Sequence, residues 1–124
     1  METKPLALVI EDNEDQNLVF TTALKQAGYE VESIFNGETA RKRVAATLPD
    51  MVILDLHMPE VDGNVILGDI RADKRLQNTR VILATADAAF ADSLQPQADL
   101  VLLKPISFSQ LHQLVSRYKS PPNE

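Results

Sequence analysis

The sequence contains no cysteine, which excludes disulfide bonds and thiol chemistry. It has no apolar stretch near the roughly 20 residues that a membrane-spanning helix needs, and its N-terminus shows no apolar secretory segment. A chain without these features suits a reducing compartment. We therefore expect a cytoplasmic location and no membrane contact.

Positive charge is scarce and dispersed. The chain has 12 Lys and Arg against 18 Asp and Glu, for a formal net charge of −6, and the basic residues form no stripe. Because a protein needs concentrated positive charge to neutralise nucleic-acid phosphates, we predict no direct nucleic-acid binding. Glycine is also scarce. None of the four glycines forms a GxGxxG loop after the first apolar run, which argues against a dinucleotide or flavin site.

Four short apolar runs are present, and each ends in a residue suited to phosphate or metal chemistry. Runs of Val, Ile and Leu of this length are typical of strands buried on both faces, as in a parallel sheet covered by helices. The carboxyl ends of parallel strands share one edge of the sheet, where open α/β folds form binding crevices. The runs are LALVI before Glu11-Asp12, MVIL before Asp55, VILA before Thr85, and LVLL before Lys104-Pro105.

Strand and helix patterns alternate five times along the chain. Five such units are too few for a closed eight-stranded barrel, so we predict an open, doubly wound α/β sheet with right-handed crossovers. The segment Glu30 to Phe35 is the most polar strand, which suits a sheet edge and favours a flavodoxin-like (βα)5 fold with strand order 2-1-3-4-5. The length of 124 residues predicts a single domain, 1–124, with a core at about 4–119 and a flexible tail or linker at 120–124.

Apolar spacing and end signals place the helices. The first is predicted over 13–27 with Gly28 as a left-handed cap, and Pro49 is predicted to end the second. Ser107 and Gln110 form a capping box for the last helix, and the Ala-rich stretch 87–97 leaves room only for a short one. The residues expected on apolar helix faces are Leu18, Val19, Ala23, Leu24, Ala27, Ala40, Val44, Leu48, Val65, Ile66, Leu67, Ile70, Phe108, Leu111, Leu114, Val115 and Tyr118.

The predicted sheet should bring three carboxylates, one hydroxyl and one ammonium into one shallow pocket. Asp55 ends an apolar strand, where an ionised side chain is costly unless it is compensated. Glu11 and Asp12 add like charges beside it, which destabilise the fold unless a cation lies between them, and Mg²⁺ prefers such hard oxygen ligands. Thr85 and Lys104 offer the hydroxyl and the positive charge that phosphate oxygens need, and Lys104 is expected to pair with Asp55.

Simpler explanations exist for single members of this set. Asp12 or Asn13 could cap the first helix, and Thr85 could reflect only strand propensity. Taken in order, however, the set resembles the receiver domain of two-component response regulators and is similar to stand-alone chemotaxis-type receivers. The resemblance covers residues 4–119 and rests on Glu11-Asp12, Asp55, Met58-Pro59 with Asp62-Gly63, Thr85-Ala86, and Lys104-Pro105.

The resemblance implies a phospho-acceptor switch in signal transduction, not an enzyme with an external substrate. Asp55 would take a phosphoryl group from a phosphohistidine of a sensor histidine kinase or a phosphotransfer protein. It would form an acyl phosphate and promote only this transfer and its own dephosphorylation. Asp12, Asp55 and the main-chain carbonyl of His57 would bind Mg²⁺ directly, and Glu11 would act through a coordinated water.

The same resemblance assigns the remaining site residues and an output surface. Thr85 would bind a phosphoryl oxygen, and Lys104 would bridge Asp55 before phosphorylation and the phosphate after it. The Lys104-Pro105 peptide is expected to be cis, since X-Pro bonds carry only a small penalty for this. A downstream effector protein would contact the face formed by the fourth helix, fifth strand and last helix. A phosphorylation-dependent homodimer is also expected.

The chain departs from the receiver pattern at one switch position. Receivers often carry an aromatic residue three places before the lysine, where this chain has Val101. Phe90 or Tyr118 could substitute for it, although both are more simply core or interface residues. This departure supports an alternative hypothesis, a pseudo-receiver that acts as a phosphorylation-independent interaction scaffold. The acidic pocket with Thr85 and Lys104 argues against that alternative.

The two histidines are not expected to donate phosphate. His57 is predicted at the pocket mouth, where it could tune hydrolysis of the acyl phosphate together with Asp87 on the opposite rim, and His112 is predicted at the surface of the last helix. A metal-dependent phosphohydrolase of similar sheet order is a third hypothesis. Such an enzyme usually has an acid/base Asp two residues beyond its nucleophile, where this chain has His57, so it is the weakest of the three.

Overall fold

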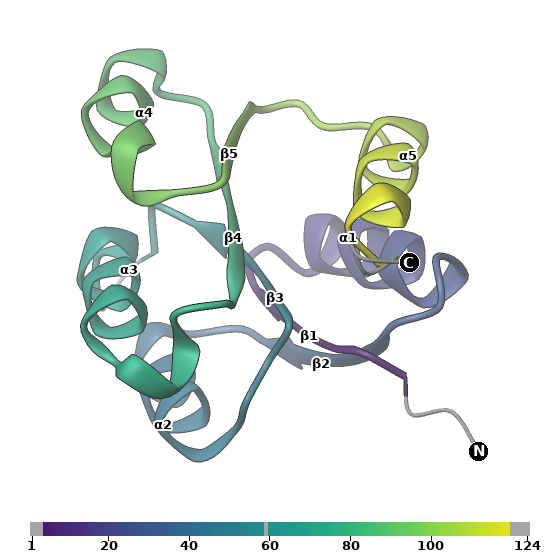
Figure 1. Cartoon of the computed structure of the whole chain (residues 1–124). Coiled ribbons are helices and arrows are strands. Elements are labelled where there is room, and N and C mark those ends of the chain that lie inside the picture. Colours follow the sequence, from purple (N-terminus) through teal and green to yellow (C-terminus); the bar gives the residue numbers. More distant parts are fainter. Residues whose placement is uncertain (1–3, 59, 120–124) are drawn as a thin grey trace.

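The computed structural model describes residues 4–58 and 60–119, which form a five-stranded parallel sheet in the order β2-β1-β3-β4-β5. The predicted flavodoxin-like fold and strand order are therefore confirmed (Figure 1). Pro59 and the predicted tail at 120–124 lie outside the described residues. The elements are β1 (Leu6–Ile10), α1 (Glu14–Gln26), β2 (Glu30–Ile34), α2 (Gly37–Ala46), β3 (Met51–Asp55), α3 (Gly63–Ala72), β4 (Arg80–Thr85), α4 (Ala88–Leu94), β5 (Leu100–Leu103) and α5 (Phe108–Lys119), with short 3-10 turns at Lys74–Leu76 and Gln95–Gln97.

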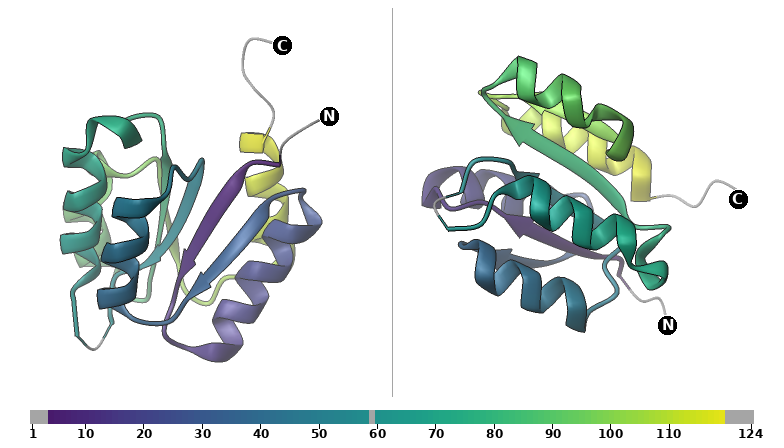
Figure 2. Two further views of the ribbon diagram at one scale, coloured as in Figure 1. Left: turned by 90° about the horizontal axis from the view of Figure 1, so that it is seen from below. Right: turned by 90° about the vertical axis from the view of Figure 1, so that its left-hand side faces the viewer.

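Helices cover both faces of the sheet. Figures 1 and 2 show α1 and α5 on one face and α2, α3 and α4 on the other. Side chains that alternate along the strands fill two separate cores, because successive residues of a strand point to opposite faces. Leu8 and Leu54 lie in the core beneath α2 to α4, whereas Val9 and Ile53 lie in the core beneath α1 and α5. Three of the four apolar runs, in β1, β3 and β4, are thus buried on both faces, as predicted. The prediction is wrong for LVLL, which is only partly buried because β5 is an edge strand of the sheet.

Helix α1 begins and ends where the sequence predicts. The Asn13 side chain accepts a hydrogen bond from the Gln16 amide at 2.9 Å, and Gly28 has a φ of 102°, the left-handed region that favours glycine. The predicted apolar face is wrong at Leu18, which is 66% exposed. Asn17 occupies the inner face in its place, because its amide donates hydrogen bonds to main-chain carbonyls at the sheet edge.

Helix α2 ends earlier than its apolar spacing suggests. Ala40 and Val44 are buried as predicted, but the helix stops at Ala46 and Leu48 is 63% exposed. Thr47 already has extended backbone angles, so the chain leaves the helix two residues before Pro49. A proline disfavours helical geometry at the residue before it, and here the exit comes one residue earlier still.

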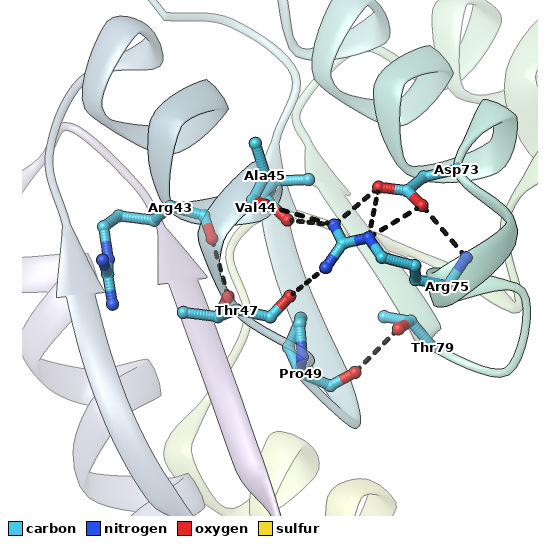
Figure 3. A network of polar contacts seen from close by, with 8 residues as sticks. All are labelled: Arg43, Val44, Ala45, Thr47, Pro49, Asp73, Arg75 and Thr79. Carbon is cyan, nitrogen blue, oxygen red and sulfur yellow. Dashed lines mark hydrogen bonds and ion pairs between the residues drawn. The ribbon is translucent and has the colours of Figure 1, made fainter.

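Arg75 closes the end of α2 from outside the helix (Figure 3). Its guanidinium donates to the carbonyls of Val44 and Ala45, both at 3.3 Å, and it is held by Asp73 at 2.6 Å. The last carbonyls of a helix have no hydrogen-bond donors within the helix. A left-handed glycine after the helix often lets backbone amides donate to them, but the described residues after α2 include no such glycine. The guanidinium of Arg75, from the 3-10 turn after α3, therefore caps the C-terminal end of α2.

The remaining helices match the prediction with one exception. Val65 of α3 is 41% exposed, while the other predicted face residues of that helix are buried. Helix α4 has seven residues, which confirms the short fourth helix. Ser107 accepts a hydrogen bond from the Gln110 amide at 3.0 Å, as expected for the start of α5. No helix within the described residues is both long enough and apolar enough to cross a bilayer.

Candidate functional site

The register of the sheet brings the ends of four strands to one edge. Ile10 pairs with Leu54, so Glu11 and Asp55 follow neighbouring residues on β1 and β3. Asp55 is itself opposite Ala84, one residue before Thr85 on β4. Thr85 pairs with Leu103, the residue before Lys104, on β5. This parallel register is the reason that residues far apart in sequence meet at the same edge.

Three carboxylates form a cluster there. Glu11, Asp12 and Asp55 each offer an oxygen, and these oxygens all lie within 4.8 Å of one another. Glu11 is 1% exposed and Asp55 is 3% exposed, whereas Asp12 is exposed to solvent. The sequence-based prediction that these three residues converge is confirmed, with one solvent-exposed carboxylate and two buried ones.

Burial and a neighbouring negative charge raise the pKa of the Glu11 carboxyl. Removal from solvent is the largest cause that raises the pKa of its carboxyl to about 7, and the negative charge of Asp55 adds to it. The hydrogen bond from Lys104 acts in the opposite direction without cancelling the effect. The ionised form of Glu11 is therefore costly even with Lys104 beside it, and the cluster has three carboxylates against this one ammonium. An excess of hard, negatively charged oxygens fits a divalent cation such as Mg²⁺.

Lys104 lies between the two buried carboxylates. Its Nζ is 2.9 Å from Glu11 Oε1 and 3.5 Å from Asp55 Oδ1. The expected pairing with Asp55 is present, but Glu11 is the closer partner and takes the hydrogen bond, which the sequence did not indicate. The expected cis peptide between Lys104 and Pro105 is also present.

Thr85 is fully buried beside this cluster. Its Oγ1 accepts a hydrogen bond from the Asp87 amide at 3.0 Å, and Asp87 Oδ1 in turn accepts one from the Phe90 amide at 3.0 Å. These bonds fix the start of α4 to the end of β4. Among the described residues, no acceptor is bonded to the Thr85 hydroxyl proton, so that proton is available to an oxygen in the site.

His57 follows the end of β3, two residues after Asp55. Its amide donates to Asp55 Oδ1 at 3.1 Å, and its exposed imidazole lies against the Phe90 ring, with centroids 5.4 Å apart and planes tilted by 45°. The predicted position at the site's mouth agrees with this exposure. His112 stacks instead on Phe108 of α5, at 5.7 Å, and belongs to a different element.

Phe90 and Tyr118, the two residues suggested as substitutes for the aromatic that is missing at position 101, lie on opposite faces of the sheet. Phe90 packs against the same core as Val101, beneath α2 to α4. Tyr118 packs against the opposite core, with the Arg80 guanidinium 4.6 Å from its ring centre. Of the two, Phe90 is therefore the one that shares a core with Val101.

Asn17 contributes to the site although the sequence analysis did not single it out. It is buried, and its amide donates to the main-chain carbonyls of Glu11 at 3.0 Å and Ile34 at 3.2 Å. These bonds hold the chain at Glu11 against the end of β2. The available signal was a polar residue at helical spacing with Phe20 and Leu24, where an apolar one is expected.

Comparison with known proteins agrees with this geometry. A probable transcriptional regulator of Guillardia theta, ycf27, is 33% identical over 114 residues, which cover 90% of this chain and 44% of that protein. The chain thus spans less than half the length of this relative. The chemotaxis response regulator CheY4 of Vibrio cholerae shares the fold with a TM-score of 0.84 at 23% identity, over 94% of this chain and 99% of that one.

A second solved structure bears on the acidic cluster. The receiver domain of the sensor histidine kinase PA1611 of Pseudomonas aeruginosa PAO1, described with a magnesium ion coordinated in its active-site cleft, has a TM-score of 0.81 and 26% identity. The match covers 94% of this chain and 98% of that one. The model of the response regulator receiver domain family matches residues 7–116. With the sheet order, the acidic edge and this match in agreement, the chain belongs to the response regulator receiver domain family.

Proposed function

We propose that this chain, as a single receiver domain over 1–124, accepts a phosphoryl group on Asp55 in a Mg²⁺-dependent reaction and thereby changes its protein contacts. The observation that carries the proposal is the cluster of Glu11, Asp12 and Asp55 oxygens within 4.8 Å of one another, with the Lys104 ammonium beside it. Buried carboxylates next to a lysine and a hydroxyl suit phosphoryl transfer, which depends on positioning and charge neutralisation.

Each residue has a definite role in this proposal. An Asp55 carboxylate oxygen attacks the phosphorus of a phosphohistidine on a histidine kinase or phosphotransfer protein. A P–O bond forms, the P–N bond breaks, and the electron pair stays on the imidazole nitrogen. Lys104 and the Thr85 hydroxyl proton then bind phosphoryl oxygens. The product is an acyl phosphate, and the domain promotes only this transfer and its own dephosphorylation.

Asp12, Asp55 and the main-chain carbonyl of His57 would hold Mg²⁺, with Glu11 acting through a coordinated water. Bound Mg²⁺ supplies positive charge against the charge on the transferring phosphoryl group. Three carboxylates with a single lysine beside them support this assignment, because a divalent cation would supply the positive charge that one ammonium does not. An exposed Asp12 beside two buried carboxylates also leaves a route from solvent to the cluster.

The output of the domain is a protein contact on the α4-β5-α5 face. Strand β5 is only partly buried, and Leu103 at its end is half exposed, so this face offers apolar surface to a partner. An effector protein or a second phosphorylated copy would bind there, in a cytoplasmic two-component pathway.

Intact-mass measurement tests the proposal directly. After incubation with acetyl phosphate and Mg²⁺, the protein should gain the mass of one phosphoryl group. The gain should be absent in Asp55→Asn and after chelation of Mg²⁺. Asp62→Asn is a matched control, because Asp62 is exposed and its side chain makes no capping bond to α3. A folded protein that never gains mass would favour the phosphorylation-independent scaffold instead.

A further inference from the structure

Phe90 connects α4 to the candidate site by two routes. Along the first route, the Asp55 carboxylate accepts the His57 amide at 3.1 Å, and the His57 ring contacts the Phe90 ring at 5.4 Å. This separation lies within the range of favourable aromatic pairs. The first route therefore reaches α4 through His57, whose main-chain amide is hydrogen-bonded to the candidate nucleophile.

The second route passes through the end of β4. Thr85 Oγ1 accepts the Asp87 amide, and Asp87 Oδ1 accepts the Phe90 amide, both at 3.0 Å. Both routes thus end on one residue, its ring in the first and its backbone amide in the second. Phe90 is partly buried and packs against the core beneath α2 to α4, where Val101 also packs.

A change at Asp55 would alter both routes at once. Attachment of a phosphoryl group turns a carboxylate into an ester-like acyl group, which is a weaker hydrogen-bond acceptor for the His57 amide. The same phosphoryl group offers an acceptor to the Thr85 hydroxyl proton, and any movement of Thr85 toward it pulls on the Asp87 amide. Since α4 has only seven residues, few internal bonds resist such a displacement.

We propose that Phe90 is the positioning residue that couples α4 to the chemical state of Asp55, through ring contact with His57 and the Thr85–Asp87 hydrogen bonds. The inference rests on the proposed phosphorylation of Asp55. It assigns to α4 the aromatic side chain that Val101 cannot supply on β5. Ala91 and Leu94 are buried and anchor the inner face of α4 in the core. The start of the helix, at Phe90, is therefore the part that moves when Asp55 is modified.

Hydrogen exchange of the α4 amides, measured beside intact mass, tests the coupling. In the wild type, acetyl phosphate with Mg²⁺ should add a phosphoryl group and change α4 exchange rates by roughly fivefold or more. Phe90→Leu keeps an apolar side chain in the core but removes the ring. It should gain the same mass while the change in α4 exchange falls below about twofold.

Two further variants separate coupling from packing. Phe90→Tyr retains the ring and should respond as the wild type does. Val101→Ala removes apolar volume from the same core and should also keep the response. A wild-type response in Phe90→Leu, loss of the response in Val101→Ala, or unchanged α4 exchange in phosphorylated wild type would each overturn the inference alone. A wild type that gains no mass would overturn the proposed function and the coupling together.

Discussion

At the scale of single residues, Lys104 determines the charge balance of the site. Its Nζ hydrogen-bonds Glu11 and lies 3.5 Å from Asp55, so one ammonium serves two buried carboxylates. Breaking an ion pair that is largely buried leaves an uncompensated charge, which is strongly destabilising. The same ammonium also opposes any other cation at the cluster, since like charges repel at short range.

We therefore expect Lys104→Met to lower the stability of the fold and to raise its affinity for Mg²⁺. Without Mg²⁺, the free energy of unfolding should fall by roughly 1–3 kcal/mol, because Glu11 and Asp55 lose their counter-charge. Mg²⁺ affinity, measured by titration calorimetry, should rise by roughly tenfold. Lys42→Met on the exposed face of α2 is the control and should change neither quantity. Weaker Mg²⁺ binding in Lys104→Met would contradict this account of the site.

Tyr29 makes the free energy of unfolding depend on pH, and it does so apart from the acidic cluster at the end of the sheet. Its hydroxyl donates to the Val115 carbonyl at 3.0 Å, and burial is the largest cause that raises the pKa of the phenol to about 12. The folded state thus holds this proton more tightly than the unfolded state, where the pKa of the phenol is near its ordinary value of 10.0. The stabilisation is complete below pH 10 and is lost as the pH rises toward 12.

Denaturant unfolding between pH 9 and about 11.5 measures this loss. The Tyr29 contribution should decline by up to about 1.4 kcal/mol per pH unit above pH 10. Tyr29→Phe should cost about 1 kcal/mol at pH 9 and should show a shallower decline, since only the other titrating groups remain. Parallel declines in the two proteins would show that Tyr29 does not carry the effect.

At the scale of secondary structure, two glycines of α3 differ in what surrounds them. A Cβ added at Gly68 would meet nothing within 4 Å, so the glycine there only weakens the helix. A Cβ at Gly63 would lie 2.6 Å from Leu56 Cα and 2.7 Å from the Asp55 carbonyl oxygen. Gly63 is therefore required by the close approach of α3 to the end of β3, beside the candidate acceptor.

Alanine substitutions at these two positions should have opposite signs. Gly68→Ala should raise the free energy of unfolding by about 1 kcal/mol, because alanine has the higher helix propensity. Gly63→Ala should lower it by about 1–3 kcal/mol, because the backbone of β3 must shift to admit the methyl group. Equilibrium unfolding by urea measures both variants. A stabilised Gly63→Ala would mean that the approach of α3 to β3 is looser than described.

At the scale of the whole molecule, the cluster of Glu11, Asp12 and Asp55 at the end of the sheet lowers the stability of the folded state. Two nearly buried carboxylates are removed from solvent beside a third, and burial together with the negative charge of Asp55 raises the pKa of Glu11. A ligand that binds only the folded state stabilises it by mass action. Occupation of this edge by a divalent cation should therefore be visible as global stabilisation.

Thermal unfolding with and without Mg²⁺ should show this linkage. Free Mg²⁺ at about ten times its Kd should add about 1.4 kcal/mol to the free energy of unfolding. Asp12→Asn should abolish most of the gain without unfolding the protein, because Asp12 is exposed. NaCl at matched ionic strength serves as the control for screening. Equal stabilisation by NaCl would remove the argument for a bound ion.

The sequence by itself determined the strands, their order and the residues that meet at the sheet edge. Continuous apolar runs leave few alternatives to a parallel sheet covered on both faces, and such a sheet must collect the residues after its strands. Family resemblance added the cis peptide at Pro105 and the roles proposed for Asp55 and Lys104. These features depend on local pattern and on the order of motifs along the chain.

Only the tertiary structure decided which partner each polar group takes. Asn17 displaces Leu18 from the inner face of α1 because its amide donates to the carbonyls of Glu11 and Ile34, and Lys104 lies closer to Glu11 than to Asp55. The contact between His57 and Phe90 likewise joins residues from different elements. Periodicity describes one segment at a time, whereas hydrogen bonds and ion pairs depend on distances between segments that are fixed only when the whole chain has packed.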